Sequence, residues 1–208
     1  MQNPNYMFYK PKSIVIAPII IGLVLCVMQM DSFGQRGNMW CFGDSSGIDF
    51  NTSPPTTFIT SVKSRGSCAS ISDSLGNLLM YTYTRAAMPG KTSLMFNRND
   101  SLMQNGDNIV GEGWYYESVL LPKPGFSTIY YLFNIGVTDF YGLHYSEIDL
   151  SLNNGLGAVT QKNVQINNFK ADDGLTAVKH GNGRDWWLFF RKASLSTSAS
   201  NTFYKYLI

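Results

Sequence analysis

Charge and histidine are both scarce in this chain. Of its 208 residues, 14% are charged and two are histidines, whereas about 25% are charged in typical soluble domains. Sixteen Lys and Arg nearly balance fourteen Asp and Glu, so the formal net charge is +2, and no block of like charge occurs. A nucleic-acid-binding protein needs a basic patch or stripe to neutralise phosphates. We therefore expect no nucleic-acid partner.

Cysteine is nearly absent as well, with three in the whole chain. The sequence contains neither the paired C-x-x-C spacing of a zinc site nor the D-x-[DN]-x-[DN]-G pattern of a calcium loop. We therefore expect no metal ion and no cofactor. Two alternatives are open for Cys41 and Cys68: a disulfide, which an oxidising compartment permits, or two buried free thiols.

Long apolar runs are missing except for residues 14–28, which two lysines precede. These fifteen residues include a proline, and they are fewer than the roughly 20 that a membrane-spanning helix needs. Ser32 and Gly34 are small residues at the positions that precede a cleavage point before Gln35. Residues 1–34 are thus predicted to be a signal peptide. We expect the mature protein to be secreted or on the outer cell surface, with no membrane span after cleavage.

The rest of the chain is rich in Tyr, Phe, Ser, Thr, Asn and Gly, a mixture that favours strands and turns. Short apolar runs bounded by turn residues recur without an amphipathic helix pattern, which predicts an all-β fold. Three segments share one layout of strand, turn, strand and later strand. Their second strands begin at Leu78, Ile129 and Trp186, and the offsets of 51 and 57 residues are close to the length of a propeller blade.

We therefore predict that residues 35–208 form a partial β-propeller of about three antiparallel blades, and a β-sandwich is the alternative. Such repeats come in sets of at least about four. The last strand runs directly to Ile208 without a turn or cap. We expect the domain to be truncated at its C-terminus, with the remaining blades of the same polypeptide as its partners.

The strands of the three units are expected at 69–72, 78–82 and 93–98, at 118–121, 129–134 and 142–150, and at 175–178, 186–191 and 202–208. Each unit has a turn between its first two strands, at 73–77, 122–127 and 180–184. These turns contain Gly together with Asp, Asn, Ser or Pro, the residues that turns favour for their backbone geometry.

Several short motifs also occur in a recognisable order. They are WCFG at 40–43, GIDF at 47–50, CASISD at 68–73, GNLLMYT at 76–82, FNRN at 96–99, LSLNNGLG at 150–157, LTAVKH at 175–180 and GRDW at 183–186. Together they resemble the N-terminal β-propeller region of large secreted bacterial surface proteins that carry PKD-type domains and a gliding-motility-associated, type IX secretion C-terminal sorting domain. The resemblance covers residues 38–208 and implies secreted or cell-surface display.

The chain departs from this family in three places. Cys41 stands where the family pattern has an aromatic residue, which indicates a strand residue and not half of a framework disulfide. Residues 83–89 lack the Asp-Gly turn that is common there, and no sorting domain follows Ile208. Without a sorting domain, the chain alone would not be expected to pass through that secretion system.

Residues suited to catalysis are few, and their spacing selects none of them. His144 alternates with its neighbours as an outward strand position would, and His180 is expected to bond local backbone in a turn. Asp73 and Asp172–Asp173–Gly174 are interpreted as turn residues. The carboxylates available for a paired glycosidase site are Glu112, Glu117, Asp139, Glu147, Asp149, Asp172, Asp173 and Asp185.

Aromatic side chains are the remaining candidates for binding. Adjacent aromatics on a strand face opposite sides, so one of each pair should fill the packing between blades. The run Trp114, Tyr115 and Tyr116 follows two glycines and is predicted to be an exposed ligand platform. We therefore expect a non-enzymatic recognition, adhesion or structural display module whose partner is a glycan or a surface protein. The alternative is an extracellular carbohydrate-active enzyme.

Overall fold

The computed structural model describes residues 33–208 except 65, 86–89, 139 and 194–201. The chain divides into two units, Met1–Phe33 and Gly34–Ile208, and all the sheets described below belong to the second. The predicted signal peptide therefore lies outside the described residues, apart from its last two positions. These begin a short 3-10 helix, η1 (Phe33–Gly37).

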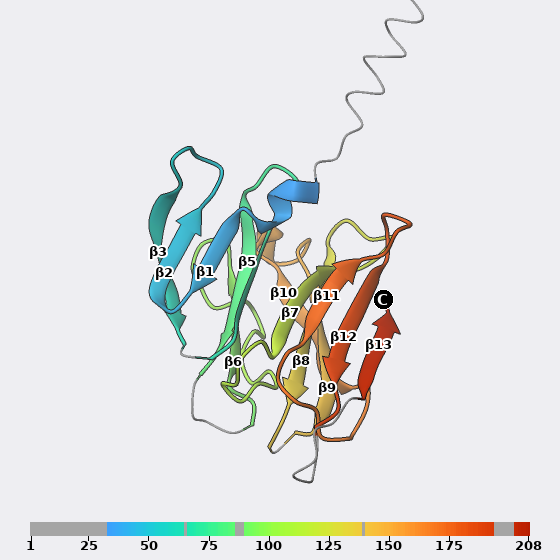
Figure 1. The fold of residues 1–208 in the computed structure, drawn as a ribbon. Helices are drawn as coiled ribbons and strands as arrows, with labels where there is room; N and C mark the ends of the chain where they lie inside the picture. The colour runs from blue at the N-terminus through green and yellow to red at the C-terminus, as the bar shows by residue number, and fades with distance from the viewer. Residues whose placement is uncertain (1–32, 65, 86–89, 139, 194–201) are drawn as a thin grey trace, which may run out of the picture. The chain divides into compact units, whose positions relative to one another are not determined.

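The described chain consists of short strands joined by turns, which confirms the all-β prediction (Figure 1). A second 3-10 helix, η2, covers Asn153–Gly155. The strands are β1 (Met39–Phe42), β2 (Asp44–Asp49), β3 (Thr56–Lys63), β4 (Cys68–Ser72), β5 (Leu78–Thr84), β6 (Ser93–Asn97), β7 (Ser118–Pro122), β8 (Ile129–Gly136), β9 (Gly142–Asp149), β10 (Ala158–Gln165), β11 (Thr176–Lys179), β12 (Trp186–Arg191) and β13 (Phe203–Leu207).

These strands form four separate sheets, each built from strands that follow one another in the chain (Figure 1). We name them sheet A (β1–β2–β3), sheet B (β4–β5–β6), sheet C (β7–β8–β9–β10) and sheet D (β11–β12–β13). Every pair of neighbouring strands is antiparallel. Short turns suffice for this connectivity, because antiparallel neighbours need no crossover.

The predicted repeat corresponds to sheets B, C and D. Strands β5, β8 and β12 begin at Leu78, Ile129 and Trp186, and each is the second strand of its own sheet. The expected number of about three antiparallel units is too small, because sheet A precedes them as a fourth. Its register pairs Met39 with Asp49, and Asp49 with Thr56 on the next strand.

The turn predicted between β4 and β5 is present. The carboxylate of Asp73 accepts the backbone N–H groups of Leu75 and Asn77 at 2.8 and 2.9 Å. Gly76 has a φ of 87°, which is in the region that glycine adopts without the steric cost of a Cβ. The local chemistry of this turn, with Asp at its start and Gly near its end, therefore sets the β4–β5 connection.

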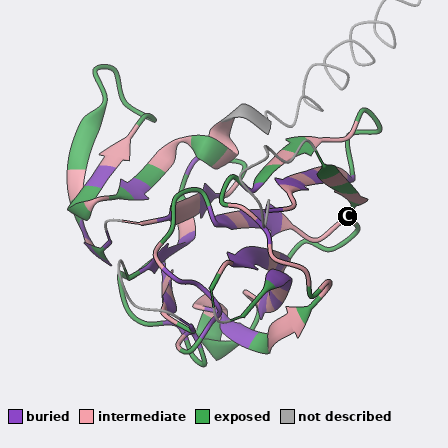
Figure 2. Cartoon of the chain, turned by 60° about the horizontal axis from the view of Figure 1, so that its bottom comes forward, coloured by how far each residue is buried: buried purple, intermediate pink, exposed green. Residues whose placement is uncertain are grey.

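The apolar core lies at the seams between consecutive sheets. One cluster joins sheets A and B around Cys41, Val62 and Tyr81. A second joins sheets B and C around Met80, Met95, Leu132 and Ile148, and a third joins sheets C and D around Phe133, Leu143, Leu188 and Phe190. Figure 2 shows the buried residues along the strands of these sheets and the exposed ones mainly in the connecting loops.

The two central sheets are covered on both faces. On β5, Met80 belongs to the seam with sheet C, while the next residue, Tyr81, belongs to the seam with sheet A. On β8, Leu132 packs toward sheet B and Phe133 toward sheet D. Successive side chains of a strand point to opposite faces, so each central strand supplies two different cores. The four sheets are therefore stacked in chain order.

Candidate ligand-binding site

The first strand presents two aromatic rings to solvent. Cys41 is buried, whereas Trp40 and Phe42 on either side of it are 53% and 38% exposed. This pattern follows from the alternation of side chains along a strand. One face of β1 thus packs against sheet B, and the other presents its rings to solvent.

Trp40 is held in place from two directions. Its indole Nε1–H donates to the carbonyl oxygen of Gly37 at 2.8 Å. Its ring meets that of Phe50 edge to face, with centroids 5.0 Å apart and an interplanar angle of 60°. Edge-to-face contact is a favoured arrangement of aromatic pairs. The indole is therefore fixed in orientation although half of its surface is exposed.

The loop before β7 is clamped at both ends. The carboxylate of buried Glu117 accepts the N–H of Gly113 at 2.9 Å. The carbonyl oxygen of Tyr116 accepts the N–H of Leu175 at 2.7 Å. Tyr116 has a φ of 50°, a left-handed conformation that costs energy for a bulky residue and is held here by these contacts. The loop leaves Tyr115 and Tyr116 64% and 76% exposed.

The rings of β1 and of this loop border one hollow, which we name the aromatic groove. Its larger part has a volume of about 620 Å³ and includes Trp40, Phe42, Cys68 and Tyr116 in its lining. Its smaller part, of about 360 Å³, shares the last three of these residues and adds Tyr115. Among the described residues, no acidic or basic side chain lines either part. The groove therefore offers aromatic faces, hydroxyls and thiols.

Two free thiols lie in the lining of the groove. Cys41 and Cys68 form no disulfide, so of the two alternatives the structure has free thiols. Burial, with the nearby Asp100 and Cys68, raises the pKa of Cys41 to about 12. Burial also raises the pKa of Cys68, against hydrogen bonds from Ser64 and Gly43 that lower it. A protonated thiol is a poor nucleophile, so the groove holds no activated cysteine.

Only two of the three residues of the predicted ligand platform line the aromatic groove. Tyr115 and Tyr116 line the groove, whereas Trp114 is 43% exposed and is not among the lining residues. Sequence reasoning missed Trp40 and Phe42. Residues 39–42 read Met-Trp-Cys-Phe, which is apolar throughout, so the sequence does not mark which of these side chains are exposed.

Glu112 and Glu117 are both buried and both serve the backbone. The Glu112 carboxylate accepts the N–H groups of Val137 and Thr138 at 3.0 and 2.6 Å. The Glu117 carboxylate accepts the N–H of Glu112 at 3.2 Å in addition to that of Gly113. Burial raises the pKa of Glu117, while hydrogen bonds from Thr84 and from the loop backbone lower it. These acids anchor loops, and neither of them lines the aromatic groove.

The other carboxylates have structural partners or lie in turns. Asp139 lies outside the described residues. Asp173 is exposed in the turn before Gly174, which has a φ of 109°. Arg184 and Asn182 lower the pKa of Asp185 to about 2. The remaining partners are Lys123 for Glu147, the Ser151 N–H for Asp149, Arg191 for Asp172 and Arg184 for Asp185.

The two histidines differ in how well the sequence predicted them. His180 accepts the N–H of Asn182 on its Nδ1 at 3.1 Å, the predicted bond to local backbone. The prediction that His144 points outward is wrong, because His144 is only 5% exposed. Strand β9 is covered on both faces near this residue, so alternation with Leu143 and Tyr145 does not bring it to the surface.

Residues 43–47 read Gly-Asp-Ser-Ser-Gly and match the G-x-S-x-G pattern of serine hydrolases. That pattern requires a sharp turn from a strand into a helix. Here Gly43 connects β1 to β2 and the other four residues begin β2, and Gly43 and Ser45 have positive φ values of 61° each. Among the described residues, no hydrogen bond joins Ser45 to a histidine. The motif is therefore a hairpin turn.

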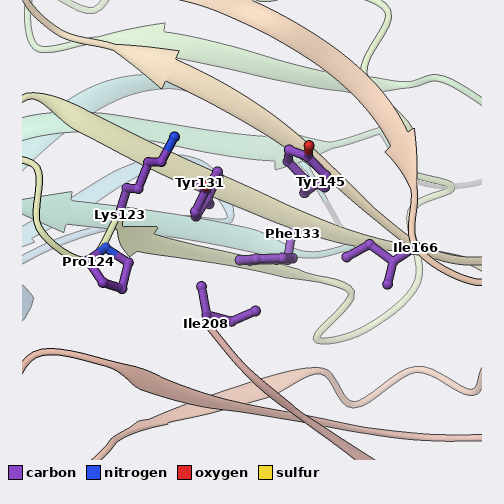
Figure 3. Close-up of a pocket in the computed structure, with 7 residues that line it drawn as sticks. All are labelled: Lys123, Pro124, Tyr131, Phe133, Tyr145, Ile166 and Ile208. Atoms are coloured by element: carbon purple, nitrogen blue, oxygen red, sulfur yellow. The ribbon is translucent and has the colours of Figure 1, made fainter. Parts of the chain in front are cut away.

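A second cavity, of about 430 Å³, lies at the seam of sheets C and D (Figure 3). Tyr131, Phe133 and Tyr145 line one wall, and Ile208 points toward them from the end of β13 (Figure 3). These four residues belong to the hydrophobic cluster that joins the two sheets. Lys123, at the rim, is 2.7 Å from a Glu147 oxygen. The cavity is therefore a space within the packing of the seam.

In comparisons with known proteins, no family model, no curated protein and no solved structure matches the chain. Among the described residues, no three His, Cys, Asp or Glu side chains lie close enough together to hold a metal ion. In the same part of the chain, no helix is both long enough and apolar enough to span a membrane. The function is therefore argued from the geometry of the site.

Proposed function

We propose that the chain is a carbohydrate-recognition module with the architecture of a partial β-propeller, displayed outside the cell. The aromatic groove carries this proposal. Four exposed rings, two from β1 and two from the loop before β7, border one open hollow. Aromatic rings provide broad apolar faces, and Tyr adds a polar tip, which suits the mixed apolar and hydroxylated surface of a sugar. Exposed apolar patches of this kind mark binding sites.

The groove suits binding better than hydrolysis. Glycoside hydrolysis uses two carboxyl groups that flank the bond to be cleaved. Among the described residues, no carboxyl group lines the aromatic groove. The two buried acids nearest to it in sequence, Glu112 and Glu117, accept backbone N–H groups instead. We therefore propose recognition without catalysis.

The stacking of the sheets supports a radial arrangement. Each central sheet is covered on both faces by its neighbours in the chain, as a propeller blade is. The first strands of sheets A, B and C also meet in turn, because β1 contacts β4 and β4 contacts β7. Strands that line a common axis would meet in this way. A sandwich has two packed sheets, each with one inner face, so this stacking favours a propeller.

Export is the part of the proposal that depends on residues 1–34. The order of charge, apolar run and small residues supports it, and the resemblance to secreted surface proteins points the same way. N-terminal sequencing of the protein recovered from outside its host cell should give Gln35 as the first residue. Recovery of the protein only from the cytoplasm, with Met1 or residues 14–28 still present, would contradict export.

Calorimetric titration with a panel of neutral oligosaccharides tests the groove. Trp40→Ala and Tyr116→Ala should each weaken binding about tenfold, the effect of losing roughly 1.4 kcal/mol of contact. Phe203→Ala is the matched control, since it removes an exposed ring on β13 away from the groove. Binding that neither groove variant weakens, or no binding of any oligosaccharide by the unaltered protein, contradicts the proposal.

A further inference from the structure

A separate hollow, which we name the polar pocket, has a volume of about 410 Å³. It lies beside β9 and β10, and its lining includes Lys91, Phe140, Tyr141, His144, Asn163 and Gln165. It shares no lining residue with the aromatic groove. Its volume is within the range of about 300–1,000 Å³ that is usual for small-molecule sites. It is therefore a second site with its own chemistry.

Two lysines lie over an aromatic pair that lines this pocket, and one of them, Lys91, is itself a lining residue. The Nζ of Lys91 is 5.0 Å from the centroid of the Phe140 ring, and the Nζ of Lys170 is 5.9 Å from that of Tyr141. Both rings are exposed. In the described part of the chain, neither ammonium forms an ion pair with a carboxylate. The pocket thus combines a stacking surface with positive charge that a ligand can neutralise.

Glu112, which acts electrostatically on His144 of this pocket, is committed to the protein backbone. The carboxylate of buried Glu112 accepts the N–H groups of Val137 and Thr138, the Thr138 hydroxyl at 2.9 Å and the Phe140 N–H at 3.3 Å. These bonds fix the loop that carries Phe140. Because its oxygens are held by loop donors, Glu112 orients the aromatic ring and leaves Lys91 available to an anion.

His144 supplies a hydrogen-bond acceptor. Its Nδ1 is 3.2 Å from the carbonyl oxygen of Gly142, so this nitrogen carries the proton and donates it. Burial lowers the pKa of His144, as does Lys91, while Gly142 and Glu112 raise it. The neutral ring leaves Nε2 as an acceptor, and no protein donor among the described residues reaches it. A ligand hydroxyl can donate to this atom.

The amides of β10 form a fixed polar wall. Asn163 accepts the N–H of Val110 on Oδ1 at 2.8 Å and donates from Nδ2 to the carbonyl of Asn108 at 2.9 Å. Gln165 donates from Nε2 to the carbonyl of Tyr141 at 2.8 Å. This bond orients the Gln165 amide and leaves its Oε1 as a second acceptor for ligand hydroxyls. The wall is therefore set before any ligand binds.

We infer that the polar pocket binds a sugar acid, a pyranose that carries a carboxylate. The carboxylate pairs with the Lys91 ammonium, and the apolar face of the ring lies against Phe140 and Tyr141. Ring hydroxyls donate to His144 and Gln165. An uncharged sugar would meet the same rings and acceptors but would leave the cation unpaired. This inference goes beyond the proposed function, because it uses none of the residues of the aromatic groove.

Titration with D-glucuronate and with D-glucose tests it, since the two sugars differ at C6 in the carboxylate. The protein should bind glucuronate at least tenfold more tightly than glucose, and added salt should reduce this preference because it screens the charge pair. Lys91→Met should remove the preference, because it removes the partner of the carboxylate. Lys63→Met, which removes an exposed lysine on β3, is the control and should keep the preference. A tri-galacturonate shows whether the carboxylate of a chain is bound as well as that of a free sugar.

Gln165→Leu provides a second variant with a different signature. It should weaken glucuronate and glucose alike and keep their ratio, because it removes a hydroxyl acceptor and no charge. Equal affinity of the unaltered protein for the two sugars, or a preference that survives Lys91→Met, overturns the inference. Tyr116→Ala should leave glucuronate binding intact. The experiment therefore distinguishes failure of the proposal for the aromatic groove from failure of the proposal for the polar pocket.

Discussion

The backbone N–H of Ser118 donates to the hydroxyl of Ser67 at 3.2 Å. Ser118 begins the first strand of sheet C, and Ser67 immediately precedes the first strand of sheet B. The two serines are separated by 51 residues, the same offset that separates Leu78 from Ile129. The bond therefore joins nearly equivalent positions of consecutive repeats.

Ser67→Ala should lower the free energy of unfolding by about 1–3 kcal/mol, because the buried N–H of Ser118 would lose its acceptor. Both residues are buried, so water cannot readily replace the hydroxyl. Urea denaturation followed by fluorescence measures the change. Ser74→Ala, at an exposed position of the β4–β5 turn, should stay within about 0.5 kcal/mol of the unaltered protein. Equal effects of the two substitutions would show that the bond between sheets contributes nothing.

Glu117→Gln should change how stability depends on pH. Burial raises the pKa of Glu117 above its ordinary value of 4.5, so the folded state holds this proton more tightly than the unfolded state. The contribution of Glu117 to stability is therefore largest below pH 4.5 and falls as pH rises through the folded pKa. The difference in unfolding free energy between the unaltered protein and Glu117→Gln should decrease from pH 4 to pH 7.

Asp149→Asn is the control of opposite sign for this measurement. Hydrogen bonds from Ser151 lower the pKa of Asp149. Its contribution is present above the unfolded pKa of 3.8 and is lost as pH falls through the folded value. The corresponding difference for Asp149→Asn should therefore increase as pH rises toward 3.8 and stay nearly level above it. The same direction of change in both variants would contradict the environment described for Glu117.

Sheets B, C and D were predictable because each begins with a strand and a turn whose chemistry is local. Asp73 and Gly76 make the first turn by contacts within five residues. Sheet A escaped prediction because β2 reads Asp-Ser-Ser-Gly-Ile-Asp, and only Gly47 in it is buried. Its strands are defined by backbone pairing with their neighbours, which a hydrophobic pattern does not record.

The candidate site was half predictable for a similar reason. A run of three aromatics after two glycines identified Tyr115 and Tyr116 as exposed. Trp40 and Phe42 come from a strand that is distant in the sequence, and only the stacking of sheets A and B brings them to Tyr116. The error at His144 has the same origin, because its burial comes from chain segments outside β9 that no local alternation can indicate.

Cys41 should react with a thiol reagent more slowly than Cys68 in the folded protein. Its pKa is raised to about 12, so little thiolate exists at pH 8, and it is also the more buried of the two. Single-thiol variants in a Cys26→Ser background separate the rates. Both thiols should react at one common rate in urea. A faster reaction of Cys41 under native conditions would contradict its position in the seam between sheets A and B.

Gly136→Ala should destabilise the protein strongly, by about 3 kcal/mol, because an added group must displace close-packed backbone. A Cβ at Gly136 would lie 1.4 Å from the carbonyl oxygen of Phe140, so the β8–β9 connection would have to open. Gly181→Ala is the matched control, since a Cβ there meets nothing within 4 Å, and its effect should not exceed about 1 kcal/mol. Because Phe140 would move with the loop, Gly136→Ala should also weaken glucuronate binding under conditions in which the variant is still folded. A variant that keeps both its stability and its affinity for glucuronate would contradict this prediction. It would show that the β8–β9 loop accommodates the added methyl group despite its closeness to Phe140.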